Sequence, residues 1–158
     1  MNAAPADVKT ARILVIDDNP IIQRTLYFVL RDQGYKVFLS GEIAEAMNLV
    51  RKEKPNLILL DINFPPDGSI TGGAERDGFW ALEWMRRMDE VKGVPIVMIS
   101  SAEPASASPR AHAAGAAGYL HKPINKDNLI LTVAELLKSN PPPELQSGLL
   151  LKPLWPPQ

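Results

Sequence analysis

Five polar side chains stand at or just after the ends of short apolar runs, where strands of a sheet would end. They are Asp17, Asp18, Asp61, Ser100 and Lys122. Carboxylates bind hard cations such as Mg²⁺, and they can also attack phosphorus as nucleophiles. A hydroxyl and an ammonium group can stabilise the charge on a transferring phosphoryl group. The set therefore predicts metal-assisted phosphoryl transfer, provided that the fold brings these side chains together.

Short apolar runs alternate along the chain with helical patterns. Several of the runs are continuous Ile, Leu, Val and Met, which is typical of strands buried on both faces of a parallel sheet. The alternation predicts a flavodoxin-like, doubly wound α/β fold with helices on both faces and five parallel strands in the order 2-1-3-4-5. The predicted strands are Ile13–Ile16, Lys36–Leu39, Leu57–Leu60, Ile96–Ile99 and Gly118–Leu120.

The helices differ in how clearly the sequence marks them. Asn19-Pro20 combines an N-cap residue with proline at the first helical position and predicts the start of the first helix. The fourth helix is the weakest prediction. Residues 103–109 look non-helical, and Ser108-Pro109 could start a helix only shortly before Gly115.

The expected strand order would place Asp17, Asp18 and Asp61 side by side at the edge where open α/β sheets bind ligands. Adjacent carboxylates raise one another's pKa, and a divalent cation relieves their repulsion. One carboxylate would then remain as a nucleophile that forms an aspartyl phosphate. Lys122 could neutralise the phosphoryl charge, while Ser100 could donate a hydrogen bond to it.

Four segments together resemble the signature segments of response-regulator receiver domains, specifically the stand-alone, chemotaxis-regulator-like type of two-component signalling. The resemblance implies that Asp61 accepts a phosphoryl group from a histidine kinase or a histidine phosphotransfer protein. The segments are Ile13–Asn19, Leu57–Asp61, Pro95–Ser100 and Gly118–Pro123.

The same resemblance implies roles for the other site residues. Asp17 and Asp18 would bind Mg²⁺ together with Asp61, and the backbone carbonyl of Asn63 would complete the protein ligands. Lys122 would contact the phosphoryl group, and the Lys122–Pro123 peptide bond would be cis. Ser100 and Tyr119 would form the pair of residues that switches on phosphorylation.

The resemblance predicts a receiver domain over residues 11–140, between an N-terminal extension (1–10) and a proline-rich tail (141–158). Residues 64–77 form a longer loop after the third strand than the family usually has. The tail is too short for an effector domain, although it holds the apolar cluster Leu149–Trp155. Signal output is therefore expected through contact with another protein.

Composition excludes several functional classes. Without cysteine the chain has no disulfides, thiolate metal sites or cysteine nucleophiles. A net charge of −1 gives no general attraction to nucleic acid or anionic membranes. We see no apolar run of membrane-spanning length and no signal peptide within Met1–Thr10, so a cytoplasmic protein is expected.

Four functions compete for this sequence. The leading hypothesis is a signalling switch that catalyses only its own phosphorylation and dephosphorylation and acts on an unknown downstream protein; a phosphorylation-dependent dimer stays open. A phosphorelay shuttle would pass the phosphoryl group to a second histidine protein. A haloacid-dehalogenase-type phosphatase would need a second aspartate two residues after the nucleophile, where Asn63 stands. A phosphorylation-independent binding module would usually lack one of the acids.

Overall fold

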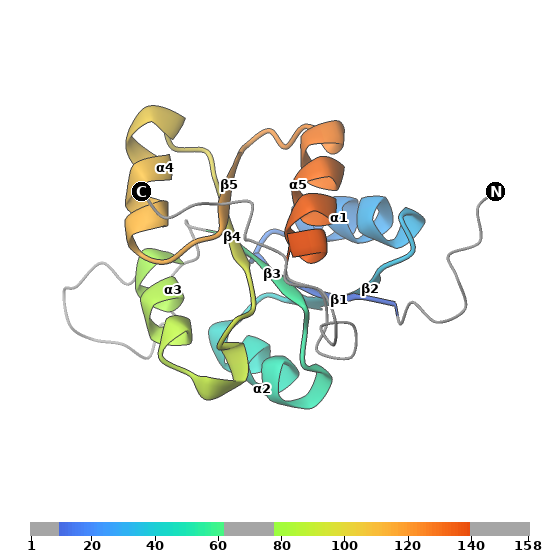
Figure 1. The fold of residues 1–158 in the computed structure, drawn as a ribbon. Helices are drawn as coiled ribbons and strands as arrows, with labels where there is room; N and C mark the ends of the chain where they lie inside the picture. Colours follow the sequence, from blue (N-terminus) through green and yellow to red (C-terminus); the bar gives the residue numbers. More distant parts are fainter. Residues whose placement is uncertain (1–9, 62–77, 140–158) are drawn as a thin grey trace.

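A computed structural model describes residues 10–61 and 78–139 of the chain (Figure 1). Its five strands pair in parallel in the order β2-β1-β3-β4-β5, which confirms the doubly wound fold. The strand bounds differ from the predicted ones by at most one residue at either end. The strands are β1 (Arg12–Ile16), β2 (Lys36–Ser40), β3 (Leu57–Asp61), β4 (Ile96–Ser100) and β5 (Gly118–His121).

Some predictions fall on residues that the structure does not describe. The predicted N-terminal extension, apart from Thr10, lies outside the described residues. The extended loop 64–77, the tail 141–158 and the predicted metal ligand Asn63 also lie outside them.

Helices cover both faces of the sheet because side chains of the central strands point alternately to either side. Leu57 and Leu59 pack with core residues of the first and last helices, whereas Ile58 and Leu60 pack with core residues of the second and third. All four side chains are completely buried. The helices are α1 (Pro20–Asp32), α2 (Ile43–Glu53), α3 (Gly78–Arg86), α4 (Pro104–Ala113) and α5 (Lys126–Ser139), with a short 3-10 helix η1 (Asp89–Val91).

The prediction of a non-helical segment at residues 103–109 is wrong, because α4 already begins at Pro104. Proline at the first helical position is favourable, since it lacks only a donor that has no partner there. Pro109 lies inside the helix and removes one backbone hydrogen bond. Ala107 and Ala111 are buried, and Ala111 belongs to one of the two core clusters. We infer that this packing outweighs the local cost, an effect of tertiary structure that the local pattern could not reveal.

Candidate functional site

Three carboxylates meet at the carboxyl edge of the two central strands. Asp17 directly follows β1, and Asp61 is the last residue of β3; the pairing of Ile16 with Leu60 makes them neighbours. Together with Asp18, they place one carboxylate oxygen each within 4.8 Å of the others. Asp17 and Asp61 are buried, whereas Asp18 is exposed. The predicted acidic cluster therefore forms, with one open side toward solvent.

The backbone around Asp17 holds its carboxylate in place. The Asp17 N–H donates to the carbonyl of Ser40 at 3.0 Å, and Asp17 Oδ1 accepts from the backbone N–H of Asn19 at 2.8 Å. The Asn19 side chain in turn caps α1 by accepting from the N–H of Ile21 at 2.9 Å. Gln23 of α1 donates its side-chain amide to the Asp17 carbonyl. The same short segment thus starts the helix and orients the acid.

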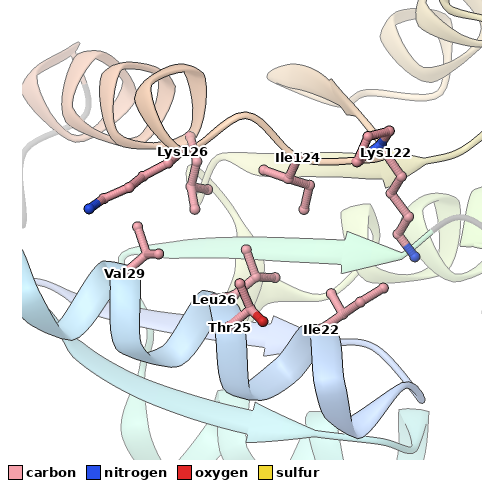
Figure 2. Close-up of a pocket in the computed structure, with 9 residues that line it drawn as sticks. Ile22, Thr25, Leu26, Val29, Lys122, Ile124 and Lys126 are labelled. Atoms are coloured by element: carbon pink, nitrogen blue, oxygen red, sulfur yellow. The ribbon is translucent and has the colours of Figure 1, made fainter.

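The side chain of Lys122 forms ion pairs with both buried carboxylates, those of Asp17 and Asp61. Lys122 follows β5, and its side chain extends toward the end of β3 (Figure 2). Its Nζ lies 3.3 Å from Asp17 Oδ2 and 3.3 Å from Asp61 Oδ1. Its backbone N–H donates to the carbonyl of Ser100 at 2.7 Å, and the Lys122–Pro123 peptide bond is cis. One ammonium group is thus shared by two acids.

Burial and neighbouring charge act against each other at Asp17. Burial raises the pKa of its carboxyl above the ordinary value, and the negative charge of Asp61 raises it further. The hydrogen bond from Asn19 and the charge of Lys122 lower this pKa, without cancelling the increase. Burial thus makes a negative charge on Asp17 costly, and the cluster of three carboxylic acids contacts a single lysine. A divalent cation with oxygen ligands would offset this cost, so the donor set fits Mg²⁺.

Ser100 and Tyr119 lie on β4 and β5, the two successive strands on one side of β3. Ser100 ends β4, one residue beyond the partner of Asp61 in the strand register, and it is fully buried. Its Oγ accepts from the backbone N–H of Ala102 at 2.9 Å. The hydroxyl of Tyr119, on β5, donates to the carbonyl of Ala102 at 2.9 Å. The two predicted switch residues therefore both hydrogen-bond to Ala102, in the loop that leads to α4.

Sequence reasoning missed the supporting residues of the site. It identified Asn19 as a helix cap but not as the donor to Asp17, and it assigned nothing to Gln23 or Ser40. One signal was present, because an aspartate often accepts from the backbone two residues later. The contacts of Ser40 and Gln23 with Asp17 depend on how β2 and α1 pack beside β1, which the sequence pattern does not encode.

The arrangement of the three acids at this edge of the sheet could hold a metal ion. Its buried acids lie at the strand ends, and the ammonium group faces both of them. Asn63, which the resemblance predicts as a metal ligand, lies outside the described part of the chain.

Within residues 10–61 and 78–139, none of the helices combines the length and the apolar character needed to cross a bilayer.

Comparison with known proteins places this geometry in a family. Residues 13–134 match the model of the response regulator receiver domain. The DNA-binding response regulator MtrA of Mycolicibacterium smegmatis is 30% identical over 134 residues, covering 85% of this chain and 54% of MtrA. This chain thus spans about half the length of MtrA. Protein PilH of Pseudomonas aeruginosa is 27% identical over 127 residues, covering 80% of this chain and 98% of PilH.

A solved structure shares the fold at lower sequence identity. It is the receiver domain of the sensor histidine kinase PA1611 from Pseudomonas aeruginosa, with a TM-score of 0.69 and 24% identity. The similarity covers 83% of this chain and 100% of that domain, which contains a magnesium ion coordinated in its active site cleft. The family match over residues 13–134 covers most of the chain. This chain therefore belongs to the response regulator receiver domain family.

Proposed function

We propose that this receiver domain is a phosphorylation switch in which Asp61 accepts a phosphoryl group from a histidine kinase or a histidine phosphotransfer protein. One observation carries the proposal: the Asp61 carboxylate lies within the three-acid cluster and 3.3 Å from the ammonium group of Lys122. In this arrangement Asp61 would be the nucleophile, the three acids would hold a cation, and Lys122 would supply a positive charge at the same edge of the sheet.

In the proposed reaction, a carboxylate oxygen of Asp61 attacks phosphorus in a phosphohistidine. The new P–O bond forms as the P–N bond breaks, and the imidazole leaves with the electron pair and takes up a proton. The ammonium group of Lys122 would shift from its contact with the carboxylates to a contact with the phosphoryl oxygens. The hydroxyl group of Ser100 would donate a hydrogen bond to one of these oxygens. The aspartyl phosphate is the only covalent intermediate with the protein.

Asp17, Asp18 and Asp61 would hold Mg²⁺, with the Asn63 carbonyl as a further ligand. Two observations support this assignment: three acids face a single lysine, and the exposure of Asp18 leaves the site open to an entering cation. The metal ion in the PA1611 receiver domain agrees with it. When bound, Mg²⁺ would neutralise charge that develops on the phosphoryl oxygens.

The domain division and the output belong to the same proposal. The family match at residues 13–134 supports a receiver domain over 11–140, with the rest of the chain as extensions. Such a domain would act in the cytoplasm through a protein partner whose affinity depends on phosphorylation. It would have no output catalysis and no DNA-binding function of its own. The geometry of the site is the same for a switch and for a phosphorelay shuttle.

The test is phosphorylation by acetyl phosphate, followed by mass spectrometry of the intact protein. We expect one added phosphate group, which depends on Mg²⁺ and is absent in Asp61→Asn. Asp32→Asn, the same chemical change at an exposed residue of α1, is the matched control and should be labelled like the unaltered protein. Equal labelling of Asp61→Asn and Asp32→Asn would refute the proposal.

A further inference from the structure

An apolar groove runs between α1 and α5, beside the acidic cluster. Figure 2 shows side chains of α1 on one side of this space, with Ile124, just before α5, and Lys126, its first residue, on the other. The cavity has a volume of about 320 Å³, and Lys122 lies at its edge. Its walls are mainly aliphatic, which favours an apolar occupant over a polar ligand. The aliphatic lining residues are Ile22, Leu26, Val29, Pro123, Ile124 and Leu129.

Exposed apolar side chains extend this groove over the outer surface of α1. Ile21 is 74% exposed and Phe28 is 49% exposed. They are seven residues apart, so they lie on the same side of the helix. Thr25, which lines the groove, lies between them. An exposed apolar surface next to an apolar groove is typical of a site that binds another protein segment.

The chain itself contains a segment that suits this surface. Residues Leu149–Trp155 supply leucine and tryptophan as apolar anchors, with Pro153 among them. Their sequence lies beyond the family match, which ends at residue 134, so they are additional to the shared domain. Proline lowers the conformational entropy lost on binding.

The segment is tethered at a suitable distance. It follows α5, and α5 forms one wall of the groove. From Ser139 back to Lys126, the helix spans about 20 Å at ~1.5 Å per residue. The ten residues from Ser139 to Leu149 can span about 33 Å when extended. A short tether of this kind gives an effective concentration of roughly millimolar, at which weak apolar binding is already populated.

We propose that Leu149–Trp155 docks in the groove between α1 and α5 of the same molecule. The docked segment covers the aliphatic walls and the exposed side of α1, next to Lys122. This contact needs no phosphoryl group, so the proposal is independent of the function proposed for Asp61.

The absence of cysteine allows a direct test on the full chain. A nitroxide label on Ser147→Cys would lie two residues before the segment and would broaden nearby amide signals in NMR spectra. We expect selective loss of the signals of Thr25, Val29 and Lys126, with recovery when the label is reduced. Adding Trp155→Ser and Leu150→Ser to the labelled chain should restore those signals by removing the anchors.

A second pair of variants tests the groove. Thr25→Arg fills it from an exposed position on α1 and should also restore the signals. Leu131→Arg, at a 56% exposed position that does not line the groove, should leave the broadening unchanged. Three results would overturn the proposal. They are no selective broadening, broadening centred on the exposed Trp84 of α3, and broadening seen only between labelled and unlabelled molecules, which would assign the groove to a second copy.

Discussion

Ser100 and Tyr119, on neighbouring strands, hydrogen-bond to opposite ends of the same residue. The N–H of Ala102 donates to Ser100 Oγ at 2.9 Å, and its carbonyl accepts from the Tyr119 hydroxyl at 2.9 Å. Any movement of Ser100 toward a phosphoryl group on Asp61 would therefore pull on the residue that Tyr119 holds. This is a physical connection between the proposed phosphorylation site and the surface of α4 and β5.

The first prediction concerns this connection. Tyr119→Phe removes the hydroxyl that holds the Ala102 carbonyl, and it should cost about 0.5–1.5 kcal/mol of unfolding free energy. In the phosphorylated state, or with a phosphate mimic, the unaltered protein should show chemical-shift changes centred on α4, β5 and α5. In Tyr119→Phe the changes should reach Ser100 and Ala102 but be reduced in α4. Tyr27→Phe, which removes a hydroxyl on α1, is the matched control. Identical shift maps for Tyr119→Phe and the unaltered protein would exclude a coupling role for this hydroxyl.

The second prediction concerns stability and pH without metal. Burial raises the pKa of Asp17 above 3.8, so the folded state keeps a proton that the unfolded state has released. Stability should therefore fall as the pH rises from about 3.8 through the raised pKa, and it should then stay lower. Asp17→Asn cannot ionise and keeps an oxygen acceptor for Asn19. Its Tm at neutral pH should be higher by about 2–4 °C, the shift expected from ~1 kcal/mol.

Thermal unfolding in chelator across the pH range measures this effect. Asp32→Asn, the same chemical change at an exposed residue of α1 outside the acidic cluster, is the matched control. A lower Tm for Asp17→Asn than for the unaltered protein at neutral pH would show that its contacts with Lys122 and Asn19 outweigh its burial.

The third prediction concerns the metal. Mg²⁺ at about 100 times its Kd should stabilise the unaltered protein by ~2.7 kcal/mol, because it binds the folded site and not the unfolded chain. Asp18→Asn removes one negative charge from the open side of the cluster and leaves a neutral oxygen that binds Mg²⁺ more weakly, so Mg²⁺ should stabilise this variant less at the same concentration. Asp89→Asn, at an exposed residue of η1, should respond like the unaltered protein. If all three proteins gained equal stability from Mg²⁺, Asp18 would not be a ligand.

The fourth prediction tests whether the positive charge of Lys122 acts by direct contact with the site. Lys122→Gln removes the ammonium group shared by Asp17 and Asp61, and phosphorylation by acetyl phosphate should slow by roughly 100-fold or more. Mg²⁺ affinity should not fall, because the carboxylates lose a competing cation. Lys126→Gln removes an exposed lysine four residues later and should keep the normal rate. A comparable loss of rate in both variants would point to long-range charge rather than to direct contact of Lys122.

The sequence by itself determined the elements and the end of the sheet where the site lies. Continuous aliphatic runs such as Leu57–Leu60 are typical of strands buried on both faces, and the predicted bounds agree with the structure to within one residue. Because parallel strands end at one edge, the positions of Asp17, Asp61 and Ser100 after such runs already implied that they converge. The four signature segments were enough to indicate the family from the sequence alone.

Tertiary structure decided everything that depends on packing between elements. It formed α4 across Pro109 because Ala107 and Ala111 are buried, whereas the local pattern predicted no helix there. It also decided which atoms share Lys122, the rise in the pKa of Asp17, and the joint hold of Ser100 and Tyr119 on Ala102. Hydrophobic periodicity reports which side of an element is buried, but hydrogen-bond distances of about 3 Å depend on how distant elements pack together. For that reason the chemistry of this site could be named from the sequence, while its electrostatics and its coupling could be read only from the fold.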